Sequence, residues 1–178
     1  MRSDRRPLTV ERMVDLETYA LAAQAGGLLL AAQWRVVTAE SCTGGAVAAA
    51  LTDVPGSSQW FERGYVTYSN LAKEQELGVT ARALSEQGAV SATVVGQMAE
   101  GALFASGAEL AVAVSGVAGP DGGTADKPVG LVWFAVARRG GAAQCTAVNL
   151  PGDRASVRRA ATQTALRLII KAVETKAE

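Results

Sequence analysis

V-V-T-A-E-S-C-T-G-G-A-V-A-A-A, residues 36–50, is the stretch that decides the fold. A β-branched run gives way to small polar residues, two glycines and an alanine-rich helical pattern, which predicts a strand that stops at a turn and opens a helix. Unpaired N–H groups and the positive end of the dipole at a helix N-terminus favour an anion or a developing oxyanion. The alternative is that Ser41 or Thr43 only caps the helix and that Gly44 and Gly45 only turn the chain.

Composition places the chain among globular proteins of one domain. It has 178 residues, of which 49% are hydrophobic and 19% charged, and its 17 Lys plus Arg balance its 17 Asp plus Glu. This balance gives no global field that would attract nucleic acid. No apolar run suits a membrane span, and no secretory signal follows the first residues, so we expect a cytoplasmic protein. We expect residues 1–9 to be disordered and residues 10–176 to form one domain.

The absence of histidine limits the chemistry. The sequence holds two cysteines, Cys42 and Cys145, and no histidine. A Ser-His-Asp triad, a Cys-His dyad and a His-ligated metal are therefore excluded, and a structural zinc site is improbable; we predict no metal and no cofactor. Without an export signal, the two cysteines are expected as reduced thiols. Hydrolytic chemistry would need lysine, tyrosine or a carboxylate as its base.

Hydrophobic periodicity predicts helices alternating with strands. Expected helices cover residues 9–33, the stretch after the turn to about 52, 71–77, 91–106 and 155–175, with 80–86 a short helix or loop. Expected strands cover residues 35–39, 59–68, 109–115, 129–138 and 143–150. Gly26 and Gly27 inside the first helix indicate close packing or a break. The order predicts an α/β fold: a single three-layer domain with a mixed β-sheet flanked by helices.

Three of the expected strands end in polar, hydroxyl-bearing or glycine-bearing turns. These ends lie at Ser41, at residues 68–70 and at Ser115–Gly116. Because sites in such sheets form outside the strand ends, the three ends would converge on one pocket.

Lys73 is the candidate base for a serine nucleophile. A serine hydroxyl is a poor nucleophile until a base takes its proton, and a lysine serves only if desolvation or positive charge lowers its pKa from about 10.4. Tyr68, at a strand end, would relay a proton or orient the serine. The alternatives are a solvated Lys73 and a Tyr68 packed at the rim. Cys42 is the alternative to Ser41 as nucleophile. Because the two residues are neighbours, the Cys42 thiol is expected to point away from the direction of the Ser41 hydroxyl and to be buried.

Glycine-rich segments follow two of the strands. Their amides would suit a phosphate, but glycine loops often only turn, and neither a Walker motif nor a dinucleotide fingerprint is present. Lys127 would either add positive charge to such a phosphate site or lie exposed to solvent. Arg154 and Arg158 would bind phosphate, or form a surface pair with Asp153.

Taken together, these stretches resemble the CinA C-terminal domain family, the nicotinamide-nucleotide amidohydrolases. The matching segments are T-A-E-S-C-T-G-G (38–45), V-P-G-S-S (54–58), F-E-R-G-Y-V-T-Y-S-N-L-A-K (61–73), L-G-V (77–79), S-G-V-A-G-P-D-G-G-T (115–124), K-P-V-G-L-V (127–132) and G-D-R (152–154). The resemblance covers roughly residues 10–173.

The resemblance implies hydrolysis of the carboxamide of nicotinamide mononucleotide to nicotinate mononucleotide and ammonia. It implies Ser41 as nucleophile, Lys73 as base and Tyr68 as assisting hydroxyl. The expected substrate-binding residues are Thr43, Gly44, Gly45, Asn70, Ser115, Gly116, Gly119, Gly123 and Thr124. The expected oxyanion donors are amides of residues 43–45 or of 115–116. The family also implies a homodimer or higher homo-oligomer, whereas the charge balance and the lack of a long apolar run predict no nucleic-acid or membrane partner. The alternatives are a non-catalytic nucleotide-binding module linked to competence or recombination, and an interaction domain without a ligand.

Overall fold

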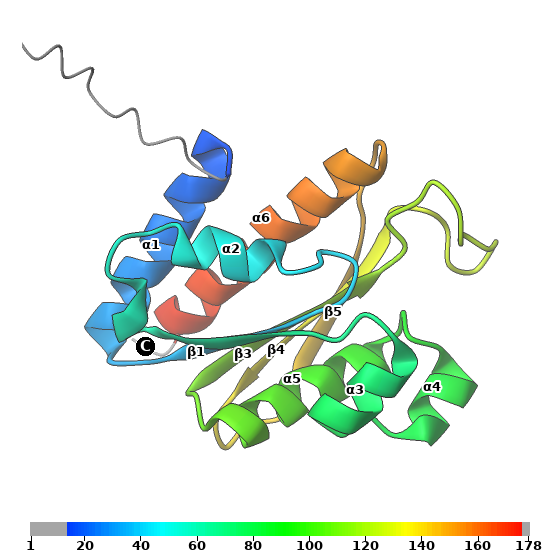
Figure 1. Ribbon diagram of the computed structural model, residues 1–178, viewed down its shortest axis with the longest axis horizontal. Coiled ribbons are helices and arrows are strands. Elements are labelled where there is room, and N and C mark those ends of the chain that lie inside the picture. The colour runs from blue at the N-terminus through cyan, green and yellow to red at the C-terminus, as the bar shows by residue number, and fades with distance from the viewer. Residues whose placement is uncertain (1–13, 176–178) are drawn as a thin grey trace, which may run out of the picture.

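A five-stranded mixed sheet forms the centre of the computed structural model, which describes residues 14–175 (Figure 1). The strands are β1 (Val36–Glu40), β2 (Phe61–Val66), β3 (Leu110–Gly116), β4 (Leu131–Arg138) and β5 (Gln144–Asn149). Their spatial order is β2-β1-β3-β4-β5. β1 pairs in parallel with β2 and β3, whereas the hairpin strands β4 and β5 continue the sheet antiparallel. The predicted mixed sheet is confirmed.

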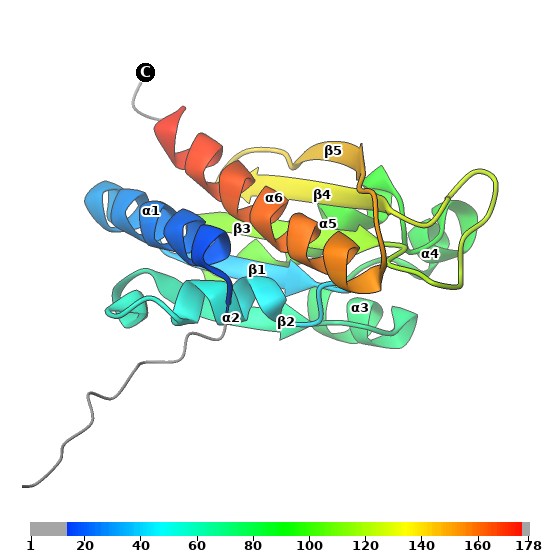
Figure 2. The ribbon, with the colours of Figure 1, turned by 90° about the horizontal axis from the view of Figure 1, so that it is seen from above.

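Helices cover both faces of this sheet (Figures 1 and 2). One layer holds α1 (Leu16–Ala32), α2 (Ala46–Thr52) and α6 (Arg154–Glu174); the other holds α3 (Asn70–Leu77), α4 (Ala81–Gln87) and α5 (Ala92–Ser106). A short 3₁₀ helix, Ser57–Gln59, precedes β2. The three-layer α/β prediction is therefore confirmed. The expected disordered residues 1–9 and the start of the expected first helix lie outside the described residues. No helix within residues 14–175 has the length and apolarity to cross a bilayer.

Strand alternation divides the core into two clusters. On β1, Val36 packs with the α1, α2 and α6 layer, whereas Val37 and Ala39 pack with the α3, α4 and α5 layer. All five residues of β1 are buried, as expected for a strand covered on both faces. Consecutive residues at the end of this strand therefore enter different layers.

Several element boundaries follow from local hydrogen bonds. The predicted cap at Ser91 is confirmed, since its hydroxyl accepts from the amide of Val94, and the predicted stop at Gly107 has a left-handed φ of 68°. β1 begins one residue later than expected because the amide of Arg35 donates to the Glu109 carboxylate rather than to a neighbouring strand. The expected strand 59–68 is shorter, because the 3₁₀ turn occupies its start.

Gly26 allows α1 to sit directly on Trp60. A Cβ at Gly26 would lie 2.5 Å from Cζ2 of the indole, and Trp60 is buried. The helix runs through Gly26 and Gly27 without interruption. Of the two sequence-based readings of these glycines, close packing applies at Gly26, since nothing lies within 4 Å of a Cβ built at Gly27.

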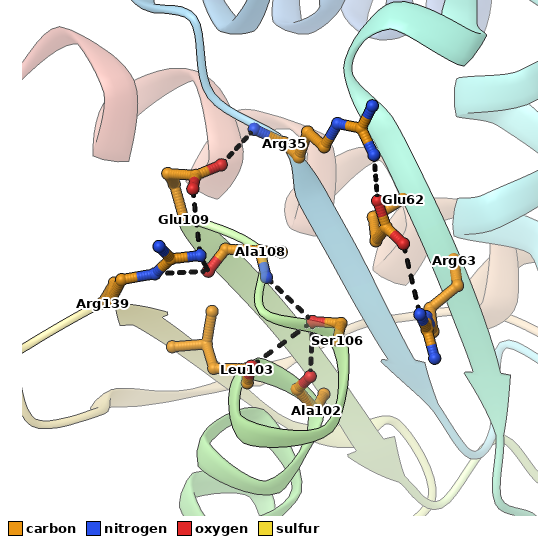
Figure 3. Close-up of polar contacts among 9 residues, drawn as sticks. All are labelled: Arg35, Glu62, Arg63, Ala102, Leu103, Ser106, Ala108, Glu109 and Arg139. Carbon is orange, nitrogen blue, oxygen red and sulfur yellow. Dashed lines mark hydrogen bonds and ion pairs between the residues drawn. The ribbon is translucent and has the colours of Figure 1, made fainter.

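Ion pairs join the elements at the amino end of the parallel strands (Figure 3). Glu109 accepts from the Arg35 amide at 2.8 Å and pairs with Arg139 at 3.0 Å. Glu62 pairs with the Arg35 guanidinium and, at 3.2 Å, with Arg63. These groups are partly exposed to solvent, so each pair is worth little on its own.

Candidate functional site

The opposite end of the sheet, where β1 and β3 end, holds a pocket of about 290 Å³. The three predicted strand ends meet here, so their expected convergence is confirmed. The predicted site residues that line the pocket are Ser41, Tyr68, Lys73, Ser115, Gly116 and Gly119. The loop that follows β3 projects at the same end of the molecule as α3 and α4 (Figures 1 and 2).

Lys73 and Ser41 form the central contact of this pocket. Ser69 caps α3 by accepting from the amide of Ala72, which places Lys73 in the first turn of the helix, facing the sheet. Lys73 Nζ lies 3.2 Å from Ser41 Oγ, 2.7 Å from the carbonyl oxygen of Thr67 and 3.3 Å from that of Tyr68. Only 1% of Lys73 is exposed, so this amine is removed from bulk water.

The surroundings of Lys73 lower the pKa of its amine. Burial lowers the pKa of the amine, and the nearby Cys42 thiol opposes this only as a lesser effect. Within residues 14–175 no carboxylate pairs with Lys73. Lys73 Nζ donates to the two carbonyl oxygens and to Ser41 Oγ, so a lone pair left on the amine by loss of one proton would face that hydroxyl. The arrangement can therefore take a proton from the serine.

Glu40 fills the N-terminus of α2 with a carboxylate from the chain itself. Its side chain is fully buried. Oε2 accepts from Thr43 Oγ1 at 2.7 Å and from the amides of Gly45 and Val47 at 3.0 and 3.1 Å, and Oε1 accepts from the amide of Ala48 at 2.8 Å. These amides are the ones that a helix N-terminus would otherwise offer to an anion.

The expected oxyanion donors at residues 43–45 need correction for this reason. The amide of Gly45 is bound to Glu40, and that of Gly44 donates to the carbonyl of Ser41 at 3.0 Å. Thr43 is buried, and none of these three residues lines the pocket. The prediction rests on the unpaired amides that a helix N-terminus usually offers. Here the Glu40 carboxylate already accepts hydrogen bonds from them.

Arg158 of α6 binds two backbone carbonyl oxygens of the same turn. Its Nε donates to the carbonyl of Cys42 at 3.1 Å and its Nη2 to that of Thr43 at 2.8 Å. The Cys42 thiol packs in the core on the α1, α2 and α6 side. Burial, and secondarily the Glu40 charge, raises the pKa of Cys42 to about 11. The thiol is therefore protonated at neutral pH, which agrees with the interpretation of a buried, unreactive cysteine.

Arg154, at the start of α6, joins two other parts of the pocket wall. Its Nη1 donates to the carbonyl of Gly119 at 2.8 Å and its Nη2 to the hydroxyl of Tyr68 at 3.0 Å. The interpretation of Arg154 and Arg158 as a surface pair with Asp153 is wrong, because both bind groups of the site region. The Tyr68 phenol contacts Arg154, and within residues 14–175 it makes no hydrogen bond to Ser41 or Lys73.

The glycine-rich loop contributes only its first part to the pocket. Gly116, Gly119, Asp121 and Gly122 line it, whereas Gly123 and Thr124 lie outside, with Thr124 in a turn closed by Lys127. Lys127 Nζ donates to the carbonyl of Gln87 and so ties the loop to the end of α4. A phosphate contact from this part of the loop therefore gains no support from the geometry.

Two further predicted residues have different surroundings. Ser115 lines the pocket, but its hydroxyl donates to the carbonyl of Ala89 at 2.7 Å and holds the segment before α5. Asn70 is exposed at the start of α3 and does not line the pocket. Within residues 14–175 no three Cys, Asp or Glu side chains gather in a group that could hold a metal ion.

Comparison with known proteins identifies the family of the chain. The family model described as the CinA C-terminal domain matches residues 18–173. The chain belongs to this CinA family. The nicotinamide-nucleotide amidohydrolase PncC of Escherichia coli strain K12 is 53% identical over 157 residues, which cover 88% of this chain and 95% of that protein. PncC of Enterobacter agglomerans is 51% identical over 163 residues, covering 89% and 99%.

A solved structure of the CinA family shares the fold. The competence/damage inducible protein CihA from Agrobacterium tumefaciens superposes with a TM-score of 0.88 at 42% sequence identity, over 92% of this chain and 99% of that chain. The family and fold predicted from the sequence are both confirmed.

Proposed function

We propose that this protein is a nicotinamide-nucleotide amidohydrolase that converts nicotinamide mononucleotide and water to nicotinate mononucleotide and ammonia. The observation that carries the proposal is the buried Lys73 amine, 3.2 Å from the Ser41 hydroxyl in a pocket at the strand ends. Relatives that are 51% and 53% identical bear this activity in their names. A sequence without histidine needs a different base for a serine nucleophile, and Lys73 supplies one.

The proposed reaction has two halves. Neutral Lys73 takes the Ser41 proton while Oγ forms a bond to the carboxamide carbon, and the C=O electrons move onto oxygen. The tetrahedral intermediate then collapses, the C–N bond breaks, and the nitrogen leaves as ammonia with the proton from Lys73. In the second half Lys73 takes a proton from water and the hydroxide adds to the ester carbon. The C–Oγ bond then breaks, Lys73 gives its proton to Ser41 Oγ, and nicotinate mononucleotide leaves.

The oxyanion needs donors other than the amides bound by Glu40. We assign the amide of Cys42 as one donor, because it directly follows the nucleophile and its residue lines the pocket. An amide in this position serves the same purpose in other serine hydrolases.

Arg154 and Tyr68 form the wall that would bind the nucleotide. The Arg154 guanidinium lines the pocket and is the group suited to the substrate phosphate. In this proposal Tyr68 orients the substrate through its hydroxyl, held by Arg154. Gly116 and Gly119 line the pocket, and their lack of a side chain lets them pack closely on Val132 and Val129. A homodimer or higher homo-oligomer and a cytoplasmic location stay predictions.

The test measures ammonia release from nicotinamide mononucleotide by the wild type, Ser41→Ala and Cys42→Ala. We expect Ser41→Ala to lose about 10³-fold or more in kcat while keeping its circular-dichroism spectrum. Cys42→Ala serves as the matched control from the same turn and keeps most of the activity. In a quenched wild-type reaction, mass spectrometry finds the ester of nicotinate mononucleotide on the peptide with Ser41.

Two outcomes contradict the proposal in different ways. Full activity in folded Ser41→Ala removes the serine mechanism but keeps the amidohydrolase. No ammonia from the wild type, together with a melting temperature raised by the nucleotide, identifies a binding module without catalysis.

A further inference from the structure

Glu40 and Ser41 are consecutive residues that face opposite layers. Glu40 points to α2, where its carboxylate accepts four hydrogen bonds, whereas Ser41 points to Lys73 of α3. The Glu40 side chain is fully buried. A buried carboxylate is retained only with such a set of donors, and every donor here lies within eight residues of it.

In the turn after Ser41, both backbone amides and backbone carbonyl groups form hydrogen bonds to buried or partly buried side chains. Glu40 binds the amides that begin α2, and Arg158 binds the carbonyls of Cys42 and Thr43 from α6. The amide of Ser41 itself donates to the carbonyl of Val114 on β3 at 2.9 Å. The main chain that carries the hydroxyl is therefore fixed from three elements: the end of β1, β3 and α6.

We propose that Glu40 is a positioning residue for the Ser41 nucleophile, and that Arg158 is its counterpart on the other side of the turn. This inference rests on the proposed function, in which Ser41 attacks the carboxamide. Reaction rates fall steeply when a nucleophile moves from its near-attack position, and a shift of about 1 Å can cost about 10²-fold. Glu40 touches neither the substrate nor the reacting atoms, so its effect passes through the geometry of the turn.

The acceptor-only chemistry of a carboxylate matters at this position. A glutamine could place its oxygen where Oε2 accepts three hydrogen bonds. Its NH₂ group would then face the amide of Ala48, which now donates to Oε1, and two donors would meet. Glu40→Gln therefore keeps the size of the side chain and disturbs the start of α2, which makes it the most informative substitution.

The experiment measures kcat and KM for ammonia release by the wild type, Glu40→Gln and Asp15→Asn. Asp15 is the matched control, since it caps α1 by accepting from Thr18 and lies outside the pocket. We expect kcat of Glu40→Gln to fall about tenfold or more with KM within about twofold, and Asp15→Asn to keep both values. Unchanged kcat in folded Glu40→Gln, or an equal loss in Asp15→Asn, overturns the inference.

Arg158→Lys provides a second variant if Glu40→Gln does not fold. A lysine has one charged group and cannot hold both carbonyls in the geometry of the guanidinium. We expect the same fall in kcat at constant KM. A rise in KM alone would instead assign Arg158 to substrate binding and would remove it, and with it the inference, from the positioning of the turn.

Cys42 supplies a readout that does not depend on amidase activity. In a Cys145→Ser background, which removes the exposed cysteine, a thiol reagent reports the reactivity of buried Cys42 alone. We expect labelling to be faster in Glu40→Gln, because the turn loosens and the nearby negative charge is lost, and unchanged in Asp15→Asn. If the wild type released no ammonia, the proposed function would fail, and this rate would still decide whether Glu40 holds the turn; an unchanged rate overturns that.

Discussion

The two ends of the sheet treat charged side chains in opposite ways. At the amino end of the parallel strands, Arg35, Glu62, Glu109 and Arg139 pair with one another at the surface (Figure 3). At the carboxyl end, Glu40 and Lys73 are buried, and within residues 14–175 neither forms an ion pair. At the amino end, exposed ion pairs join the elements, and water could hydrogen-bond the same charged groups. At the carboxyl end, the ionisable side chains are buried away from water.

The contrast also separates the two buried groups at the carboxyl end. Glu40 has four donors and no further hydrogen-bonding demand, so it holds structure. Lys73 donates to two carbonyl oxygens and a hydroxyl oxygen, has no carboxylate partner, and burial lowers the pKa of its amine. Glu40 therefore holds the turn, whereas the lowered pKa of buried Lys73 suits it to act as a base.

The largest expected effect comes from removing the base. Lys73→Met keeps an apolar side chain of similar length in the buried site but removes the amine. We expect kcat for ammonia release to fall about 10²- to 10⁴-fold, the usual contribution of a general base. Lys171→Met is the matched control, because Lys171 is exposed on α6 and lies outside the pocket. Retention of at least half of kcat in folded Lys73→Met would assign the base elsewhere.

A second effect follows from the pKa of the same lysine. The base must be neutral, and burial lowers its pKa from the ordinary 10.5, so kcat rises with pH until that lowered pKa is passed. Below the midpoint we expect about a tenfold rise per pH unit. The measurement is the pH profile of kcat at saturating nucleotide. A flat profile, or a midpoint at the ordinary lysine value, contradicts the assignment of Lys73 as base.

The lowered pKa of Lys73 also determines the direction in which the free energy of unfolding changes with pH. Because the folded-state pKa of Lys73 lies below that of the unfolded chain, the unfolded state binds more protons between the two values. The free energy of unfolding therefore gains from Lys73 as pH rises through this window, and loses as pH falls.

The smallest expected effect lies at the other end of the sheet. Glu62→Gln removes the partner of Arg35 and Arg63 at the surface. Exposed ion pairs contribute little and are screened by salt, so we expect the melting temperature to change by less than about 2 °C and kcat to stay the same. A larger fall in melting temperature would show that the two ends of the sheet differ less than their burial indicates.

Much of the fold could be predicted because its signals are local. Periodicity and the glycine-bearing turns predict the order of the elements, and the rule for sites at strand ends brings Ser41, Tyr68 and Ser115 to one pocket. The boundary of β1 was displaced by one residue, since Glu109, far along the chain, takes the amide of Arg35. No local pattern marks such a contact.

The candidate site was predictable where composition restricts the chemistry. Without histidine, few residue types can act as the base for Ser41, and the sequence predicts Lys73 in this role. Glu40 was missed because its partners are backbone amides, although the alternation along β1 signals that it faces α2. Arg154 could not be placed from sequence, because its contacts to Gly119 and Tyr68 span 35 and 86 residues.

The placement of Glu40 and Ser41 by strand alternation has a consequence for how the length of this segment can vary. Removing or adding one residue within β1 would exchange the two layers for every side chain that follows, sending the carboxylate towards α3 and the hydroxyl towards α2. Point substitutions weaken such an arrangement by degrees, whereas a change of length inverts it. Insertions and deletions among natural versions of this domain should therefore avoid β1 and its turn, and collect in the exposed hairpin turn 139–142.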